Sequence, residues 1–142
     1  MVAAQNQKTL ARFYVTHATN NGVDVTEEVT SWGLYTVFYL DNGDLRMANV
    51  SANNDTQSYG GIFNMRHKNY PETDEDYACD VFMFNWSYIN DYDSKKGTCA
   101  IEFTKVYKPQ GIVSILKTVT ESLDVIEYTG YMEGSLDFSD FL

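Results

Sequence analysis

The chain has 142 residues, with 20 acidic and 10 basic side chains that give it a formal net charge of −10. Hydrophobic residues make up 44% of the chain and aromatic residues 15%, enough for a packed core and incompatible with intrinsic disorder. A surface of this charge repels nucleic-acid phosphates and anionic lipids, so we expect no nucleic-acid partner.

The N-terminal residues contain no apolar segment typical of a signal peptide, and no run of about 18 apolar residues occurs anywhere in the chain. We therefore expect a cytoplasmic protein without a membrane span, unless an export leader has been cleaved. Cys79 and Cys99 are then expected to be reduced thiols.

Residues of high strand propensity alternate with short clusters of Gly, Asn and Asp, which is typical of an all-β chain. In the first half this pattern predicts strands over 9–19, 34–40, 45–51 and 56–65. Asn42-Gly43 predicts a type I′ hairpin, because both residues tolerate positive φ. Gly60-Gly61 predicts a bulge or a sharp corner. The segment 23–31 fits either a helical turn or an irregular connection.

The stretch 66–77 is the most polar of the chain and predicts a long surface loop. After it, strands are expected over 78–88, 98–108, 112–119 and 124–136, joined by short connections. The sequence therefore predicts an all-β fold, an antiparallel up-and-down β-barrel of about eight strands. It forms one domain over 1–142, with flexible termini at 1–8 and 137–142.

Alternate positions of a barrel strand face inward, where aromatic and cationic residues could hold a ligand. Tyrosines in strands either reflect strand propensity or line a cavity. Arginines in strands either hold an anion inside or lie on the outer face beside surface acids. The candidate ligand-binding residues are Arg12, Tyr14, Arg46, Arg66, Phe82, Phe84, Trp86 and Tyr128.

His17 and His67 are the only histidines, and neither has a further ligand at metal-binding spacing. No Gly-x-Ser-x-Gly motif is present to support a nucleophilic serine. The sequence therefore predicts no metal, no cofactor and no catalytic residue.

Several short stretches resemble bacterial lipocalin-like (calycin) domains. They include 21–26, the hairpin stretch 35–43, Phe84-Asn85-Trp86-Ser87-Tyr88 and Gly130-Tyr131-Met132-Glu133-Gly134. Lipocalins carry Gly-x-Trp on the first strand, where this chain has Ala11-Arg12-Phe13-Tyr14. The resemblance implies an eight-stranded barrel whose mouth admits a small hydrophobic ligand, and it assigns no individual binding residue.

Three hypotheses for function follow. The leading one is non-enzymatic binding of a small apolar or lipid-like ligand in the barrel interior. The second is a barrel-type isomerase or cyclase, with Glu102, Asp80 or His17 as the acid or base inside the cavity. The third is a filled barrel that forms a homodimer or other homo-oligomer through its Tyr-rich outer face. Whether the interior is empty or filled separates them.

Overall fold

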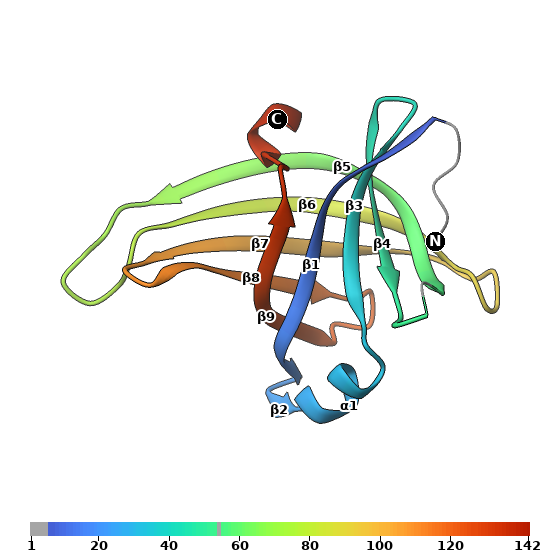
Figure 1. Cartoon of the computed structure of the whole chain (residues 1–142), viewed down its shortest axis with the longest axis horizontal. Helices are drawn as coiled ribbons and strands as arrows, with labels where there is room; N and C mark the ends of the chain where they lie inside the picture. The colour runs from blue at the N-terminus through green and yellow to red at the C-terminus, as the bar shows by residue number, and fades with distance from the viewer. Residues whose placement is uncertain (1–5, 54) are drawn as a thin grey trace.

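The computed structural model describes residues 6–53 and 55–142 (Figure 1). Strand follows strand, with one short α-helix after the first hairpin and a 3-10 turn near the C-terminus. The elements are β1 (Gln7–Asn20), β2 (Val23–Asp24), α1 (Thr26–Ser31), β3 (Tyr35–Asp41), β4 (Asp44–Val50), β5 (Thr56–Tyr70), β6 (Cys79–Asn90), β7 (Lys96–Lys108), β8 (Gly111–Val119), β9 (Val125–Gly134) and η1 (Phe138–Phe141).

The strands form a closed antiparallel barrel. From β3 to β9 each strand pairs with its neighbour in the chain, and β1 pairs with both β3 and β9. The short β2 adds two residue pairs at the end of β1. The prediction of an all-β, up-and-down barrel of eight strands is therefore confirmed, with β2 as one extra strand.

Local turn chemistry explains how the strands are joined. Asn42 and Gly43 have φ angles of 51° and 86°, so the predicted hairpin with two positive-φ residues is confirmed. Gly60 lies where β5 and β6 come close, and a Cβ there would overlap the carbonyl oxygen of Ser87. The irregularity in the β5–β6 register falls later, between Phe63 and Arg66, where Asn64 has a φ of 57°.

The arm that continues beyond one end of the barrel is formed by β5, β6, β7 and β8 (Figure 1). β4 pairs with β5 only as far as Gly61, whereas β5 pairs with β6 out to Tyr70. The prediction of a surface loop over the whole of 66–77 is therefore wrong for 66–70. These residues are polar because the arm is exposed, and polarity alone does not distinguish an exposed strand from a loop.

The barrel end next to the arm is filled by aromatic side chains. Phe138 of η1 is fully buried, and its ring centroid lies 5.1–5.8 Å from those of Phe38, Phe82, Phe84 and Phe103. The expected flexible tail is therefore packed instead, because Phe138 buries a large apolar surface. Gln7 and Lys8, expected to be flexible as well, belong to β1.

Candidate functional site

The opposite end of the barrel contains a partly enclosed cavity of about 270 Å³. It lies near the turns that join β4 to β5, β6 to β7 and β8 to β9. Its lining consists of Met47, Asn49, Ser58, Trp86, Tyr88, Asn90, Tyr92, Cys99, Leu116, Thr118, Thr120, Ile126 and Tyr128. Along β4, β6, β8 and β9 the lining residues occupy every second position, as expected for the inner face of a barrel.

Two asparagines on the cavity wall are held by hydroxyl groups. The buried Thr36 hydroxyl donates to Oδ1 of Asn49 at 2.9 Å, and the Ser58 hydroxyl donates to Oδ1 of Asn90 at 2.7 Å. Each bond links neighbours across a strand pair, β3–β4 or β5–β6, and so fixes the orientation of the carboxamide. The Nδ2 groups have no hydrogen-bond partner among the described residues and can donate to a molecule in the cavity.

An aromatic wall adjoins these amides. Trp86 is almost fully buried, and its Nε1 donates to the carbonyl oxygens of Met47 and Gly60 at 3.1 and 3.2 Å. The Tyr88 ring lies 4.9 Å from the Trp86 ring. Gly97 makes room for Tyr88, because a Cβ at position 97 would meet the tyrosine ring. The indole nitrogen is thus already satisfied, while its ring face contributes apolar surface to the cavity.

In the part of the chain that the structure describes, no charged side chain lines the cavity. Burial raises the pKa of the Cys99 thiol to about 12, with a further contribution from the Glu121 carboxylate, so Cys99 is a neutral thiol at pH 7. Burial also raises the pKa of Tyr128, and burial together with Cys99 and Glu121 raises that of Tyr88. The site therefore offers apolar surface and uncharged hydrogen-bonding groups.

The sequence-based candidates are divided between three locations. Trp86 and Tyr128 line the cavity. Phe82 and Phe84 also face inward, but they pack against Phe138 at the filled end. The other four candidates lie on the outer face of the barrel or the arm.

The three arginines do not provide an interior cation. Arg12 is exposed between the buried Ala11 and Phe13, and Arg66 is exposed on the arm, where its Nε donates to the Asn64 carbonyl. Tyr14 lies on the same outer face as Arg12, next to the rings of Tyr35 and Tyr131. The alternation of each strand explains this result, because the neighbouring apolar residues occupy the inward positions.

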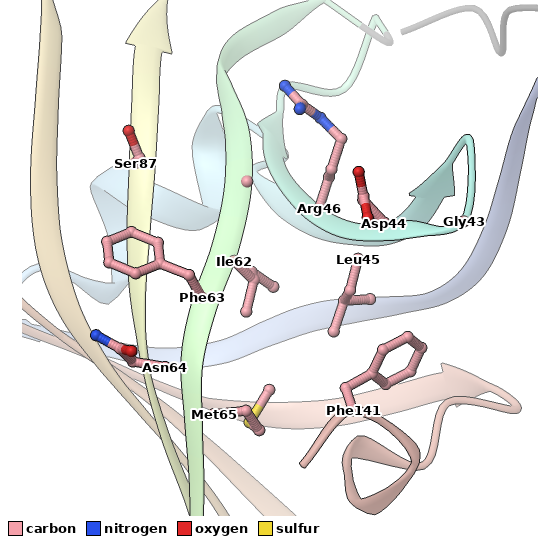
Figure 2. Close-up of a pocket in the computed structure, with 11 residues that line it drawn as sticks. Gly43, Asp44, Leu45, Arg46, Ile62, Phe63, Asn64, Met65, Ser87 and Phe141 are labelled. Carbon is pink, nitrogen blue, oxygen red and sulfur yellow. The ribbon is translucent and has the colours of Figure 1, made fainter.

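Arg46 borders a separate groove of about 560 Å³ where β4 and β5 diverge. Figure 2 shows Leu45, Ile62, Met65 and Phe141 directed toward one another, whereas Arg46 points away from them. The Arg46 Nε lies 3.4 Å from the Tyr39 hydroxyl, to which it donates.

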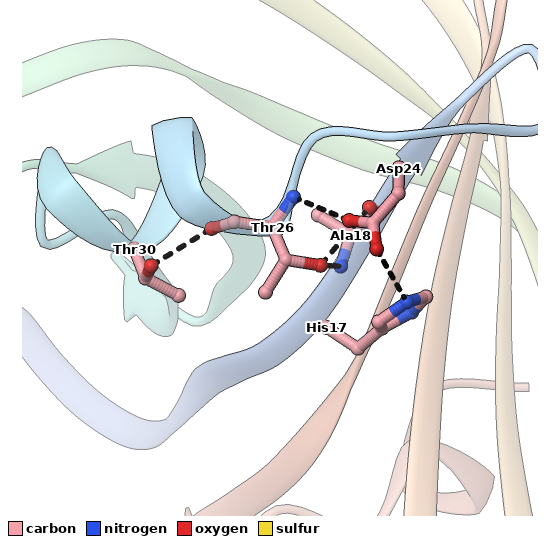
Figure 3. A network of polar contacts seen from close by, with 5 residues as sticks. All are labelled: His17, Ala18, Asp24, Thr26 and Thr30. Atoms are coloured by element: carbon pink, nitrogen blue, oxygen red, sulfur yellow. Dashed lines mark hydrogen bonds and ion pairs between the residues drawn. The ribbon is translucent and has the colours of Figure 1, made fainter.

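The three residues nominated as an acid or base lie outside the cavity. The side chain of His17 is half exposed and lies 3.6 Å from Asp24, beside the network that anchors α1 to β1 through Thr26 (Figure 3). Glu102 alternates with buried Ile101 and Phe103, and on the outer face its Oε2 is 3.9 Å from Lys117 Nζ.

Asp80 lies on the arm. It accepts hydrogen bonds from the Tyr107 hydroxyl at 2.6 Å and from Asn69 Nδ2 at 3.0 Å, and its Oδ1 is 2.7 Å from His67 Nε2. These contacts, with Tyr107 and Asn69 foremost, lower the pKa of Asp80 to about 2. The cluster connects β5, β6 and β7 in the arm, beyond the barrel core. These contacts hold the three strands together there.

The polar lining residues, above all Asn49, Ser58 and Asn90, are not among the sequence-based candidates. Asn90 could have been found, because it shares its strand and its parity with Trp86. Asn49 and Ser58 gave no such signal, since β4 has buried apolar residues on both faces and β5 changes register along its length.

Comparison of the chain with protein-family models, with curated proteins and with solved structures gives no match. In the part of the chain that the structure describes, no helix is long and apolar enough to cross a membrane. Residues 6–53 and 55–142 also contain no group of three or more His, Cys, Asp or Glu residues arranged to hold a metal ion. The two cysteines are free.

Proposed function

We propose that the protein binds a small, uncharged molecule in the open end of the barrel, without catalysing a reaction. The observation that carries this proposal is the cavity of about 270 Å³ with two oriented carboxamides, Asn49 and Asn90, whose Nδ2 groups have no partner within residues 6–53 and 55–142. Pockets for small molecules typically combine apolar walls with a few positioned polar groups in this way.

The size and charge of the cavity limit the ligand. Pockets for drug-sized ligands usually span about 300–1,000 Å³, so this cavity suits a smaller molecule or one part of a larger one. An anion such as a fatty-acid carboxylate finds no cation in the lining, and the nearby Glu121 disfavours negative charge. The ligand is therefore neutral and carries oxygen acceptors for the asparagine amides.

The same lining argues for binding rather than catalysis. General acid–base chemistry at neutral pH needs a group that titrates near pH 7 within reach of the substrate. Among the described residues, no histidine or carboxylate lines the cavity, and the Cys99 thiol is protonated. None of the three acids or bases nominated for the isomerase or cyclase alternative, Glu102, Asp80 and His17, lies there.

The test uses three neutral probes with oxygen acceptors, namely methyl β-glucoside, 1-methyluracil and N-methylpyrrolidone, with hexanoate as the anionic comparison. Saturation-transfer NMR and calorimetry measure binding to the purified protein, and native mass spectrometry detects any neutral molecule that copurifies. We expect at least one neutral probe to bind saturably and hexanoate not to bind.

Asn90→Asp keeps the size of the side chain and an acceptor for the Ser58 hydroxyl, but it removes the amide donor and adds a charge. We expect this variant to lose binding at least tenfold. Asn85→Asp makes the same chemical change on the outer face of β6 and should bind as the unmodified protein does. Absence of any saturable binding and of any copurified molecule would refute the proposal, as would equal binding by the two variants.

A further inference from the structure

A second hollow of about 580 Å³ adjoins the mouth of the barrel. It is lined by Trp32, Leu34, Ser51, Gln57 and Tyr92. Tyr92 also lines the barrel cavity, so its side chain borders both hollows. The mouth hollow is mainly aromatic and aliphatic, and its described lining, like that of the cavity, contains no charged residue.

The backbone of Trp32 is fixed by hydrogen bonds, although the residue is exposed. Trp32 is the C-cap residue of α1, and its carbonyl oxygen accepts a hydrogen bond from the Ala52 amide at 3.2 Å. The next residue, Gly33, has a φ of 61° and packs so closely on Ala52 that a Cβ at position 33 would overlap the alanine side chain. The Trp32 residue nevertheless remains 59% exposed.

Tyr92, which also lines the mouth hollow, likewise combines a fixed backbone with an exposed side chain. Its turn is held to β5 by the Asp91 amide, which donates to the Gln57 carbonyl at 2.9 Å. Two further backbone bonds at 2.9 Å, from Asn90 to Lys95 and from Ser94 to Asn90, close the turn. The residue itself is 74% exposed. Two large aromatic side chains thus border one hollow from anchored loops, an arrangement suited to holding a flat apolar group.

We propose that the ligand has two parts: a small neutral head with oxygen acceptors in the barrel cavity, and a flat apolar group that lies at the mouth against Trp32 and Tyr92. This inference rests on the proposed function, because the head occupies the cavity described above. Because Tyr92 borders both hollows, a molecule whose head lies in the cavity can reach the mouth hollow with its second part. The ligand class is a neutral amphiphile with an aromatic or other planar ring.

The test compares each methyl probe with its benzyl counterpart: benzyl β-glucoside, 1-benzyluracil and N-benzylpyrrolidone. We expect the benzyl form of a bound head to bind about tenfold more tightly than the methyl form, which is about 1.4 kcal/mol. Trp32→Ala should abolish that gain and leave the methyl probe's affinity within about twofold, because Trp32 does not line the barrel cavity. Tyr92→Ala should abolish the gain as well. Phe63→Ala, at an exposed aromatic residue on β5 beyond the filled end, should change neither value.

The outcomes separate the two proposals. Binding of a methyl probe without a benzyl gain, or a gain that survives both Trp32→Ala and Tyr92→Ala, overturns the two-part ligand and leaves the cavity proposal standing. Failure of all methyl and benzyl probes overturns both. Trp86 is the only other tryptophan, so its fluorescence in the Trp32→Ala variant reports directly on occupation of the barrel cavity.

Discussion

Replacing Phe138 with alanine tests whether the C-terminal turn completes the core. Phe138 has no exposed surface and contacts four phenylalanine rings contributed by β3, β6 and β7. Removing its ring leaves a void between strands that continuous hydrogen bonding prevents from closing. Phe→Ala changes in such positions cost about 3–5 kcal/mol of the free energy of unfolding.

The upper part of that range is expected here, because each aromatic contact adds roughly 0.5–1.5 kcal/mol beyond area burial. For a domain of this length the melting temperature should fall by about 13–17 °C. Urea unfolding, followed by near-UV circular dichroism and fluorescence, measures the free energy, and scanning calorimetry measures the melting temperature.

Phe63→Ala is the matched control, since Phe63 is 44% exposed on the same molecule. It should change the free energy of unfolding by less than about 1 kcal/mol. A loss below about 1 kcal/mol for Phe138→Ala, or equal losses for the two variants, would refute the assignment of the tail to the core. A chain ending after Ser135 should lose at least as much stability as Phe138→Ala.

Three further changes test other parts of the structure. Asp80→Asn should cost about 1–2 kcal/mol at pH 7 through weakened charge-assisted hydrogen bonds. Because the folded pKa of about 2 lies below the ordinary value of 3.8, this contribution is full above about pH 4, and the difference from the unmodified protein should narrow in urea unfolding as the pH falls toward 2. Gly60→Ala should cost about 2 kcal/mol or more, since its Cβ overlaps the Ser87 carbonyl, whereas Gly61→Ala, which has open space around it, should change stability by less than about 0.5 kcal/mol; equal thermal shifts would contradict this packing. Cys99, buried and with a pKa of about 12, should react with iodoacetamide at pH 8 only when urea unfolds the chain, as peptide mass spectrometry would show; rapid labelling of the native protein would show that the thiol is accessible.

The strand pattern and the tight turns could be predicted from the sequence because both depend on local chemistry. Asn42-Gly43 supplies the two positive-φ residues that its hairpin needs, whatever surrounds it. The alternation of β6 placed Phe82, Phe84 and Trp86 on one face, and all three do face inward. The end of β5 was missed, because an exposed strand and a loop have the same polar composition.

Four of the eight candidate residues were wrongly expected to face the interior, because inward and outward positions are chemically alike on several strands. Val37 and Tyr39 on β3 are buried on the outer face, although their composition would also suit the interior. The arginines could not be placed for the same reason, since a strand of either parity can carry a cation. Only the register between strands decides which parity faces inward.

By itself, the sequence determined the all-β class, the meander of about eight strands and the absence of an obvious catalytic motif, because these follow from local propensity and from residue order. The tertiary structure alone decided that one barrel end is filled and the other open. That outcome depends on contacts between residues far apart in the chain: Phe138 reaching Phe38 at one end, and Asn49 held by Thr36 and Asn90 held by Ser58 at the other. Such contacts arise only when strand closure brings distant segments together, which no local pattern encodes.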